Sequence, residues 1–242
     1  MIVPLVSEVE WRNWLAQGSA WPPTAASLMI GRGPVLVVAP HPDDETLGAG
    51  GLIANLRSTG VKVIVAAVTD GENAYEGIPG LGPLREKEQT NALSHLGVTR
   101  KDIFRFRIID SGVSQHEDEL AVLLEPLVRR SQHVIAPWVR DFHPDHEACG
   151  RVAERLAFKH AVELTSYLFW TWHRGTPDSL SGLSLVHIPL TEQLLDQKLQ
   201  ALVCHRSQLE REEGDPILSE RLLAPARRNF ETYLPSRVTH ER

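Results

Sequence analysis

Short apolar runs alternate along the chain with longer segments whose apolar residues recur at helical spacing. The apolar runs lie at 34–40, 61–70, 103–110, 133–138, 164–172 and 183–190. The segments with helical spacing lie at 8–17, 47–60, 84–97, 117–131, 145–161 and 191–209. A continuous β-branched run is typical of a strand that is covered on both faces. Because strands that alternate with helices form mainly parallel sheets, the pattern predicts an α/β fold of Rossmann-like type with three α/β/α layers.

The length is compatible with one domain, because 242 residues lie near the upper limit for a single hydrophobic core. We expect residues 1–33 to form an N-terminal helix and a connection that contains Pro and Gly. Residues 34–209 hold the alternating strands and helices, and the chemistry is expected there. Residues 210–242 are charged and predict an irregular tail packed on or near that domain.

Charge and cysteine content narrow the class of partner. The formal net charge of -6 argues against nucleic acid, because phosphate binding relies on clustered Lys and Arg, and it favours a small molecule. Cys149 and Cys204 stand far apart, which excludes a disulfide framework and a Cys-based zinc knuckle. No signal-peptide pattern and no run of ~18 apolar residues is present. We expect a cytoplasmic protein without an integral membrane segment. The sequence is compatible with a monomer and with a homo-oligomer.

Two similar acidic clusters follow two of the predicted strands. HPDDE at 41–45 comes after the run at 34–40, and HPDHE at 143–147 comes after the run at 133–138. Taken alone, each cluster is as well explained by a helix start as by a functional site, since Pro and acidic residues are favoured in the first turn of a helix. Ligands of open α/β sheets bind beyond the carboxyl ends of the strands, where both clusters are expected to lie. Together, the two clusters predict a metal site.

The residue types in these clusters suit zinc hydrolysis. Catalytic zinc takes three protein ligands from His, Asp or Glu and leaves one position open. His41 and Asp44 can converge on one point, and one imidazole of the second cluster, His143 or His146, completes the set; the spacing does not choose between them. Asp43 is left as a general base. The histidine that does not bind the metal can stabilise an oxyanion and protonate a leaving amine, and His143 suits this role.

Other chemistry can use the same ligands. Two histidines and one carboxylate also form the facial triad of non-haem Fe(II) oxidoreductases, and such a site accepts Fe²⁺ as well as Zn²⁺. Those enzymes usually have β-rich barrels, which the alternation of strands and helices does not match. Asp43 and His143 have clear roles only in hydrolysis, which also disfavours a module that binds metal without catalysis. The residues therefore favour a metal-dependent hydrolase; Zn²⁺ is the expected cofactor, and Fe²⁺ stays an alternative.

The chain resembles the LmbE-like or PIG-L-like family of zinc-dependent N-deacetylases. The resemblance rests on PHPDDE at 40–45 and HPDH at 143–146. Weaker matches are TDGE at 69–72, Arg85 with Glu88, and HRSQ at 205–208. The resemblance implies a deacetylase domain at 34–209 that removes an N-acetyl group from an N-acetylglucosamine-type sugar conjugate. An amidase that acts on a non-acetyl, sugar-linked amide is the alternative.

The resemblance also implies a role for each polar residue of the site. The implied roles are metal ligation by His41, Asp44 and His146, base catalysis by Asp43, oxyanion contact by His143, orientation of an imidazole by Asp145, and substrate hydroxyl contacts by Arg85 and Asp110.

Several of these and neighbouring positions have simpler explanations. Arg85 stands in a charged helix turn, and Asp110 precedes a Ser-Gly pair typical of a turn. Trp170, Trp172 and His173 are expected to fill core or rim space. The glycines at 48–51 predict close packing of a helix on the sheet rather than a phosphate loop.

Overall fold

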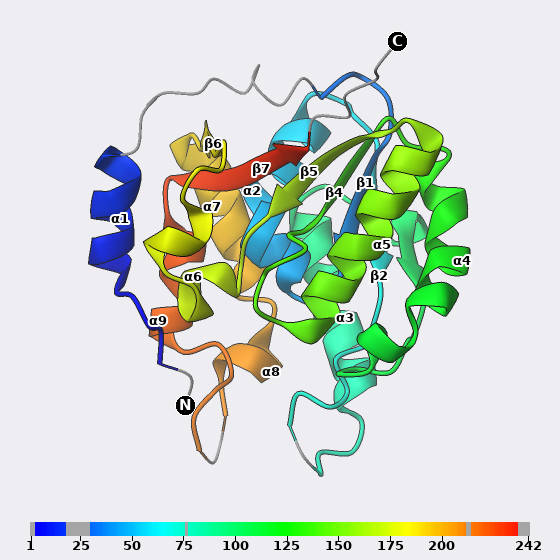
Figure 1. The fold of residues 1–242 in the computed structure, drawn as a ribbon. Helices are drawn as coiled ribbons and strands as arrows, with labels where there is room; N and C mark the ends of the chain where they lie inside the picture. The colour runs from blue at the N-terminus through cyan, green and yellow to red at the C-terminus, as the bar shows by residue number, and fades with distance from the viewer. Residues whose placement is uncertain (1–2, 18–29, 76, 212–213, 237–242) are drawn as a thin grey trace.

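The computed structural model describes residues 3–17, 30–75, 77–211 and 214–236 (Figure 1). The predicted connection at 18–29 lies outside the described residues. In the described chain, seven strands form one sheet in the order β3-β2-β1-β4-β5-β7-β6. They are β1 (Val35–Ala39), β2 (Val63–Ala67), β3 (Ile103–Arg105), β4 (His133–Pro137), β5 (Glu163–Tyr167), β6 (Val186–Pro189) and β7 (Phe230–Ser236). β1 to β5 run parallel, whereas β7 is antiparallel to both of its neighbours, so the predicted fold class is confirmed.

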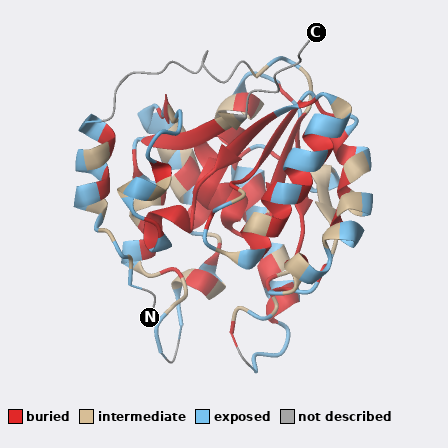
Figure 2. Ribbon diagram, in the orientation of Figure 1, coloured by how far each residue is buried: buried red, intermediate tan, exposed pale blue. Residues whose placement is uncertain are grey.

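Helices cover both faces of this sheet (Figure 1). The described helices are α1 (Glu8–Gln17), α2 (Asp44–Ser58), α3 (Leu81–His95), α4 (Glu117–Val128), α5 (Pro144–His160), α6 (Thr171–Arg174), α7 (Glu192–Leu202), α8 (Arg206–Leu209) and α9 (Glu220–Leu223). Val35, Val37 and Ala39 of β1 belong to the core under α2, α3 and α7, whereas Leu36 and Val38 belong to the core under α4 and α5. Because successive side chains of a strand point to opposite faces, a strand between two helical layers must be apolar throughout, as the buried strands in Figure 2 illustrate.

Two glycines allow α2 to approach the sheet closely. A Cβ atom on Gly48 would overlap the ring of Tyr167, and one on Gly51 would overlap the side chain of Leu190. Only glycine leaves room for that approach, so the prediction that this stretch serves helix-to-sheet packing is confirmed.

The order of the strands reverses at β1. The chain moves outward from β1 to β2 and β3, and then returns to place β4 on the other side of β1. The connections after β1 and β4 therefore lead to opposite faces of the sheet and leave a crevice at the carboxyl ends of the two strands. Both acidic clusters follow these two strands, so the topology brings them to the same crevice.

The predicted strand at 164–172 is wrong beyond Tyr167. β5 ends there, and the chain turns into α6. Asp141 holds the turn, because its carboxylate accepts backbone N–H bonds from Phe169, Trp170 and Thr171 at 3.0–3.3 Å. The carboxylate of Asp141 thus accepts the backbone N–H groups that a longer β5 would have donated to a neighbouring strand.

Two other elements are shorter than predicted. The helix predicted at 191–209 is divided into α7 and α8, and Ser207 in α8 donates its N–H and its hydroxyl to Glu88 of α3 at 2.9 and 2.7 Å. The strand predicted at 103–110 ends at Arg105, because the backbone becomes left-handed at Arg107 and Ser111, with φ angles of 56° and 66°. The first difference thus arises from a contact with another segment, and the second from the local backbone conformation.

The tail contributes a strand, so the prediction that it is irregular is wrong for 230–236. β7 lies between β5 and β6, and its Glu231 is buried. Glu231 accepts the N–H groups of Gly51 and Leu52, each at 2.8 Å, and an ion pair from Lys198 at 2.7 Å. Lys198 also donates to the carbonyl oxygen of Leu47 at 3.0 Å. The buried pair therefore ties α2, α7 and β7 together.

Replacing Lys198 by Met is expected to lower the free energy of unfolding by about 3–5 kcal/mol, because the carboxylate of Glu231 would stay buried without its counter-ion. The double variant Lys198→Met/Glu231→Gln should regain only part of that loss: neither charge is then buried, but the amide has one acceptor oxygen and cannot accept the N–H groups of both Gly51 and Leu52. Denaturant unfolding followed by circular dichroism measures both variants. The control is Lys159→Met, which removes an exposed ion pair to Glu125. A single variant as stable as the parent would contradict the role of the pair.

The N-terminal helix is present where the sequence predicts it. Trp11 of α1 is fully buried and donates its Nε1–H to the carbonyl oxygen of Trp172 at 2.9 Å. Among the described residues, no helix is both long and apolar enough to cross a membrane.

Candidate active site

Two turns between a strand and a helix carry the predicted ligands. His41 follows β1, and α2 begins at Asp44, so the first cluster projects from the start of α2. His143 is the N-cap of α5, with Pro144 in the first turn, and its Nδ1 accepts the N–H of Asp145 at 3.3 Å. Both clusters therefore do start helices, and these helix starts direct the side chains into the crevice.

His41, Asp44 and His146 form a compact group of ligand atoms. Asp44 Oδ2 lies 3.1 Å from His41 Nδ1 and 3.1 Å from His146 Nε2. The three residues offer ligand atoms within 4.8 Å of one another. His146 is fully buried, yet its Nε2 has no hydrogen-bond partner of acceptable geometry. Buried polar atoms normally have a partner, and a ring nitrogen that faces a carboxylate and a second imidazole fits a zinc ion in that role.

In both His41 and His146, the ring nitrogen that points away from Asp44 contacts other carboxylates. His41 Nε2 lies 3.2 Å from Asp110 Oδ1 and 3.2 Å from Asp145 Oδ2, and His146 Nδ1 lies 2.8 Å from Asp141 Oδ2. Burial opposes protonation of both rings, but the carboxylates outweigh it: they raise the pKa of His41 well above its usual value and that of His146 to about 9. Carboxylates in this position fix the orientation and tautomer of histidines that bind metal.

Asp145 lies against His41 rather than against the ring of His143. Its oxygens also accept the N–H groups of Ser111 at 2.8 Å and Val113 at 3.1 Å. Asp145, His41 and His143 could also hold an ion. However, these contacts already occupy Asp145, whereas Nε2 of His146 lies near Asp44 without a hydrogen bond of acceptable geometry. Asp145 therefore fits an orienting position, with His41 as its partner.

Asp141 was missed by the sequence analysis. It is fully buried, and besides His146 it accepts the backbone N–H groups that turn the chain into α6 and the hydroxyl of Thr171 at 2.6 Å. The only local signal is an acidic residue in the loop between a buried strand and a histidine cluster. The donors that give Asp141 its importance come from 169–171, and only the tertiary structure brings them close.

Replacing Asp141 by Asn is expected to weaken zinc binding about 10–100-fold, the usual effect of losing a carboxylate behind a metal-binding histidine. The amide keeps the size of the side chain but cannot accept every N–H and the His146 ring as a carboxylate does. Competition with a chromogenic chelator measures the affinity. Asp178→Asn, at an exposed position, is the control. Unchanged zinc affinity with only a lower melting temperature would mean that Asp141 serves the turn alone.

Arg85 holds Asp43 in the wall of the crevice. Its Nη2 donates to Asp43 Oδ2 at 3.1 Å and to the carbonyl oxygen of Pro42 at 3.3 Å, and its Nη1 donates to that of Gly71 at 3.0 Å. Arg85 is buried, so the explanation as a solvated residue of a charged helix turn is wrong. Burial raises the pKa of Asp43 to about 7, although the charge of Arg85 acts in the opposite direction. A carboxylate with a pKa near neutrality is suited to act as a general base.

His143 faces the crevice as a neutral ring. Burial, together with repulsion from His146 and His41, lowers the pKa of His143 to about 3. The ring stacks on Trp170, with centroids 5.3 Å apart and an interplanar angle of 20°. Trp170 thus takes the predicted rim position, whereas Trp172 belongs to the apolar core around Trp11.

Asp110 is buried and fixed by its neighbours. Its Oδ2 accepts the N–H of Asn73 at 3.0 Å, and its own N–H donates to Glu72 at 2.9 Å. These bonds join the loop after β2 to the loop after β3. The contact of Asp110 with His41 exceeds what a simple turn residue would make.

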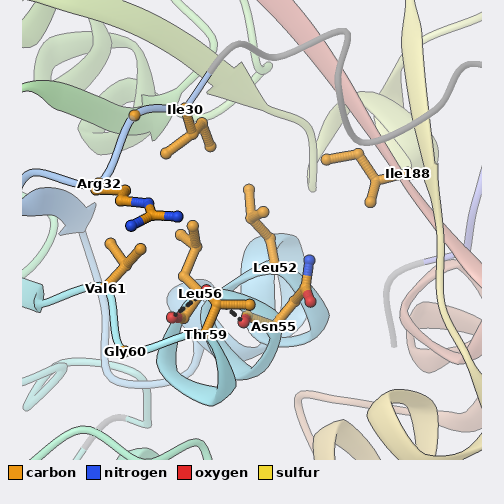
Figure 3. A pocket seen from close by; sticks show the side chains of 10 residues that line it. Ile30, Arg32, Leu52, Asn55, Leu56, Thr59, Gly60, Val61 and Ile188 are labelled. Atoms are coloured by element: carbon orange, nitrogen blue, oxygen red, sulfur yellow. Dashed lines mark hydrogen bonds between the residues drawn. The ribbon is translucent and has the colours of Figure 1, made fainter.

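A cavity of about 280 Å³ opens over these residues. Its wall includes His41, Asp43, Asp44, Arg85, Asp110, His143, Trp170, Arg174 and Gln208. A larger cavity of about 580 Å³ lies near the other end of α2, between Leu52, Leu56, Ile188 and Arg32 (Figure 3). No carboxylate or histidine lines that larger cavity among the described residues, whereas the smaller one contains His41 and Asp44 of the group of ligand atoms and is therefore the candidate active site.

Curated relatives carry related names. A protein of Bacillus cereus named "Probable N-acetyl-alpha-D-glucosaminyl L-malate deacetylase 2" is 31% identical over 196 residues, which cover 73% of this chain and 84% of that protein. A protein of Salinispora arenicola named 1D-myo-inositol 2-acetamido-2-deoxy-alpha-D-glucopyranoside deacetylase is 32% identical and covers 63% of this chain and 59% of its own length. Both names describe hydrolysis of a carbon–nitrogen amide bond.

The fold and the family agree with these relatives. The N,N'-diacetylchitobiose deacetylase of Pyrococcus horikoshii superposes with a TM-score of 0.58 and 23% identity, over 86% of this chain and 82% of that one, which supports the fold. The family profile PIG-L, described as GlcNAc-PI de-N-acetylase, matches residues 36–157. That match spans both acidic clusters and confirms the family that the sequence motifs indicate. The chain therefore belongs to the PIG-L family of de-N-acetylases, hydrolases of carbon–nitrogen amide bonds.

Proposed function

We propose that this protein is a zinc-dependent N-deacetylase that releases acetate from an N-acetylglucosamine-type sugar conjugate. The observation that carries the proposal is the buried Nε2 of His146, which lacks a hydrogen-bond partner and faces Asp44 and His41. Asp43 and His143 line the cavity beside this group. The catalytic unit is residues 34–209, and β7 completes its sheet.

His41, Asp44 and His146 would hold the metal ion. A bound zinc ion would supply Lewis acidity, which polarises an amide carbonyl and lowers the pKa of water. Asp43 takes the proton of the attacking water. Arg85 holds the carboxylate of Asp43 in the cavity wall through a hydrogen bond of 3.1 Å from Nη2 to Oδ2. The proton that Asp43 gains is then available to the leaving amine.

The hydrogen bond at Nδ1 of His143 decides how this residue acts. Because Nδ1 accepts the N–H of Asp145, the proton of the neutral ring sits on Nε2. Nε2–H can therefore donate to the oxygen that becomes negative when water attacks the amide. Trp170 keeps the ring in place by stacking on it.

The relatives named above share N-acetylglucosamine and differ in what is joined to it, so the sugar is the part of the substrate that we propose. Arg85 and Asp110 lie in the wall where sugar hydroxyls would approach. Both already have partners within the protein, and their proposed contact with substrate adds to that role.

Chelation of the purified protein is expected to abolish acetate release from a panel of N-acetylglucosamine glycosides, and added zinc is expected to restore it. Without the metal, the pKa of the attacking water is not lowered, and Asp43 cannot readily deprotonate it. The measurement is enzymatic detection of acetate, with metal content determined in parallel. Restoration by Fe²⁺ under anaerobic conditions serves as a second arm and identifies the metal that supports turnover.

Two outcomes would contradict the proposal in different ways. A protein with one zinc per chain that releases no acetate from any glycoside, but hydrolyses a propionyl or other amide, would be an amidase of different acyl specificity. Acetate release that persists in protein shown to contain no metal would remove the metal from the mechanism.

A further inference from the structure

Arg174 stands at the rim of the active-site cavity. It is the last residue of α6 and is exposed, and it lines the cavity together with Trp170 and His143. Its Cζ atom lies 4.2 Å from the centroid of the Trp170 ring, and Trp170 in turn stacks on His143. Two stacking contacts thus connect the rim to the residue proposed to face the oxyanion.

The position of this guanidinium is defined. Stacking on Trp170 restricts the plane of the group, and Nη1 donates to the carbonyl oxygen of Phe142 at 2.9 Å. An arginine carries five N–H donors, so the other donors of Arg174 stay available. A cation that is held in place loses little conformational entropy when it binds a ligand.

Arg174 has no carboxylate partner of its own in the described part of the chain. The other arginine in the cavity wall, Arg85, is paired with Asp43. Asp141 acts on Arg174 through space, but its oxygens are occupied by His146 and by donors at 169–171. Arg174 is therefore the cation of this cavity wall whose charge no neighbouring carboxylate neutralises at ion-pair distance.

We propose that Arg174 binds an anionic group, a carboxylate or a phosphate, on the part of the substrate joined to the sugar. The inference rests on the proposed deacetylase function and adds the chemical class of the aglycone. Both anions match the planar fork of a guanidinium with two parallel hydrogen bonds.

The charges of the cavity support one orientation of such a substrate. Asp43, Asp44 and Asp110 are buried in the cavity wall, whereas Arg174 is exposed, so an anion bound at Arg174 leaves the rest of the substrate free to reach the buried residues. With its anion at Arg174, the substrate presents its neutral acetamide to the buried carboxylates. Arg174 thereby selects both the substrate and the end that enters.

Four glycosides test this proposal: the carboxymethyl and phosphoethyl glycosides of N-acetylglucosamine carry the anions, and the neutral carbamoylmethyl and hydroxyethyl glycosides match them in shape. A charged hydrogen bond to arginine is expected to give the parent protein a kcat/KM about tenfold or more higher for an anionic glycoside than for its neutral match, mainly through KM. Comparison of the two anionic arms shows whether carboxylate or phosphate is preferred.

Arg174→Gln is expected to lower this ratio of kcat/KM values at least tenfold, and Arg174→Lys should retain part of it. Arg140→Gln is the matched control, because Arg140 is an exposed arginine that stacks on Trp138 outside the cavity, and it should leave the ratio unchanged. High salt should reduce the ratio in the parent protein.

An Arg174→Gln variant that loses activity equally on anionic and neutral glycosides would overturn the proposal, since Arg174 would then only support Phe142 and Trp170. No preference for anionic glycosides in the parent protein would also overturn it. Acetate release from the neutral glycosides tests the deacetylase function separately. If no glycoside is hydrolysed, calorimetric titration of the zinc-loaded protein with the free amines of the four glycosides still measures the charge preference.

Discussion

Replacing Asp43 by Asn is expected to lower kcat for deacetylation about 10²–10⁴-fold while zinc content stays unchanged. An amide cannot take a proton from water, yet it keeps the size of the carboxylate and can accept the hydrogen bond of Arg85. Arg85 also retains its bonds to the carbonyl oxygens of Gly71 and Pro42, so the guanidinium does not become an unbonded buried cation. Steady-state kinetics with metal analysis of the same sample measure both quantities.

The matched control for this variant is Asp118→Asn, in the exposed first turn of α4. It should leave kcat and zinc content unchanged. A fully active Asp43→Asn variant would remove the assignment of the base. A variant that loses its zinc would instead show that Asp43 shares in holding the metal, which is a different role from the one proposed.

Replacing His146 by Ala is expected to remove zinc and to lower kcat/KM by about a thousandfold or more, because a catalytic metal supplies several kcal/mol of stabilisation to the transition state. His146 is fully buried, and its two nitrogens face Asp44 and Asp141. A side chain on the protein surface therefore cannot take the place of the missing imidazole as a ligand. Metal analysis after dialysis and kinetics at saturating zinc measure the two effects separately.

His143→Gln is the informative comparison for His146→Ala. The geometry that leaves Nε2 of His146 without a partner predicts that His143→Gln retains zinc and loses activity, whereas His146→Ala loses both. His116→Ala, at an exposed position on the N-terminal side of α4, controls for nonspecific zinc binding by histidine. Zinc retained by His146→Ala but lost by His143→Gln would exchange the roles of the two histidines.

Most of the layer structure could be predicted because it follows from local periodicity. The apolar runs that became β1, β2 and β4 are covered on both faces and therefore carry a continuous signal. The errors lie where a remote residue competes with a local pattern. Asp141 takes the N–H groups that would have continued β5, and Glu231 and Lys198 make β7 part of a core that its charged sequence does not suggest.

The sequence by itself determined that two histidine and aspartate clusters meet at one edge of a parallel sheet, because parallel strands bring their carboxyl ends together. Which imidazole completes the metal site could not be read from spacing, since His143 and His146 lie on the same helix start. The tertiary structure decided the side-chain geometry: it directs Nε2 of His146 toward Asp44, places Asp141 behind the ring, and pairs Arg85 with Asp43. These contacts join segments far apart in the chain, and their energies depend on burial and direction, which no local pattern of residues encodes.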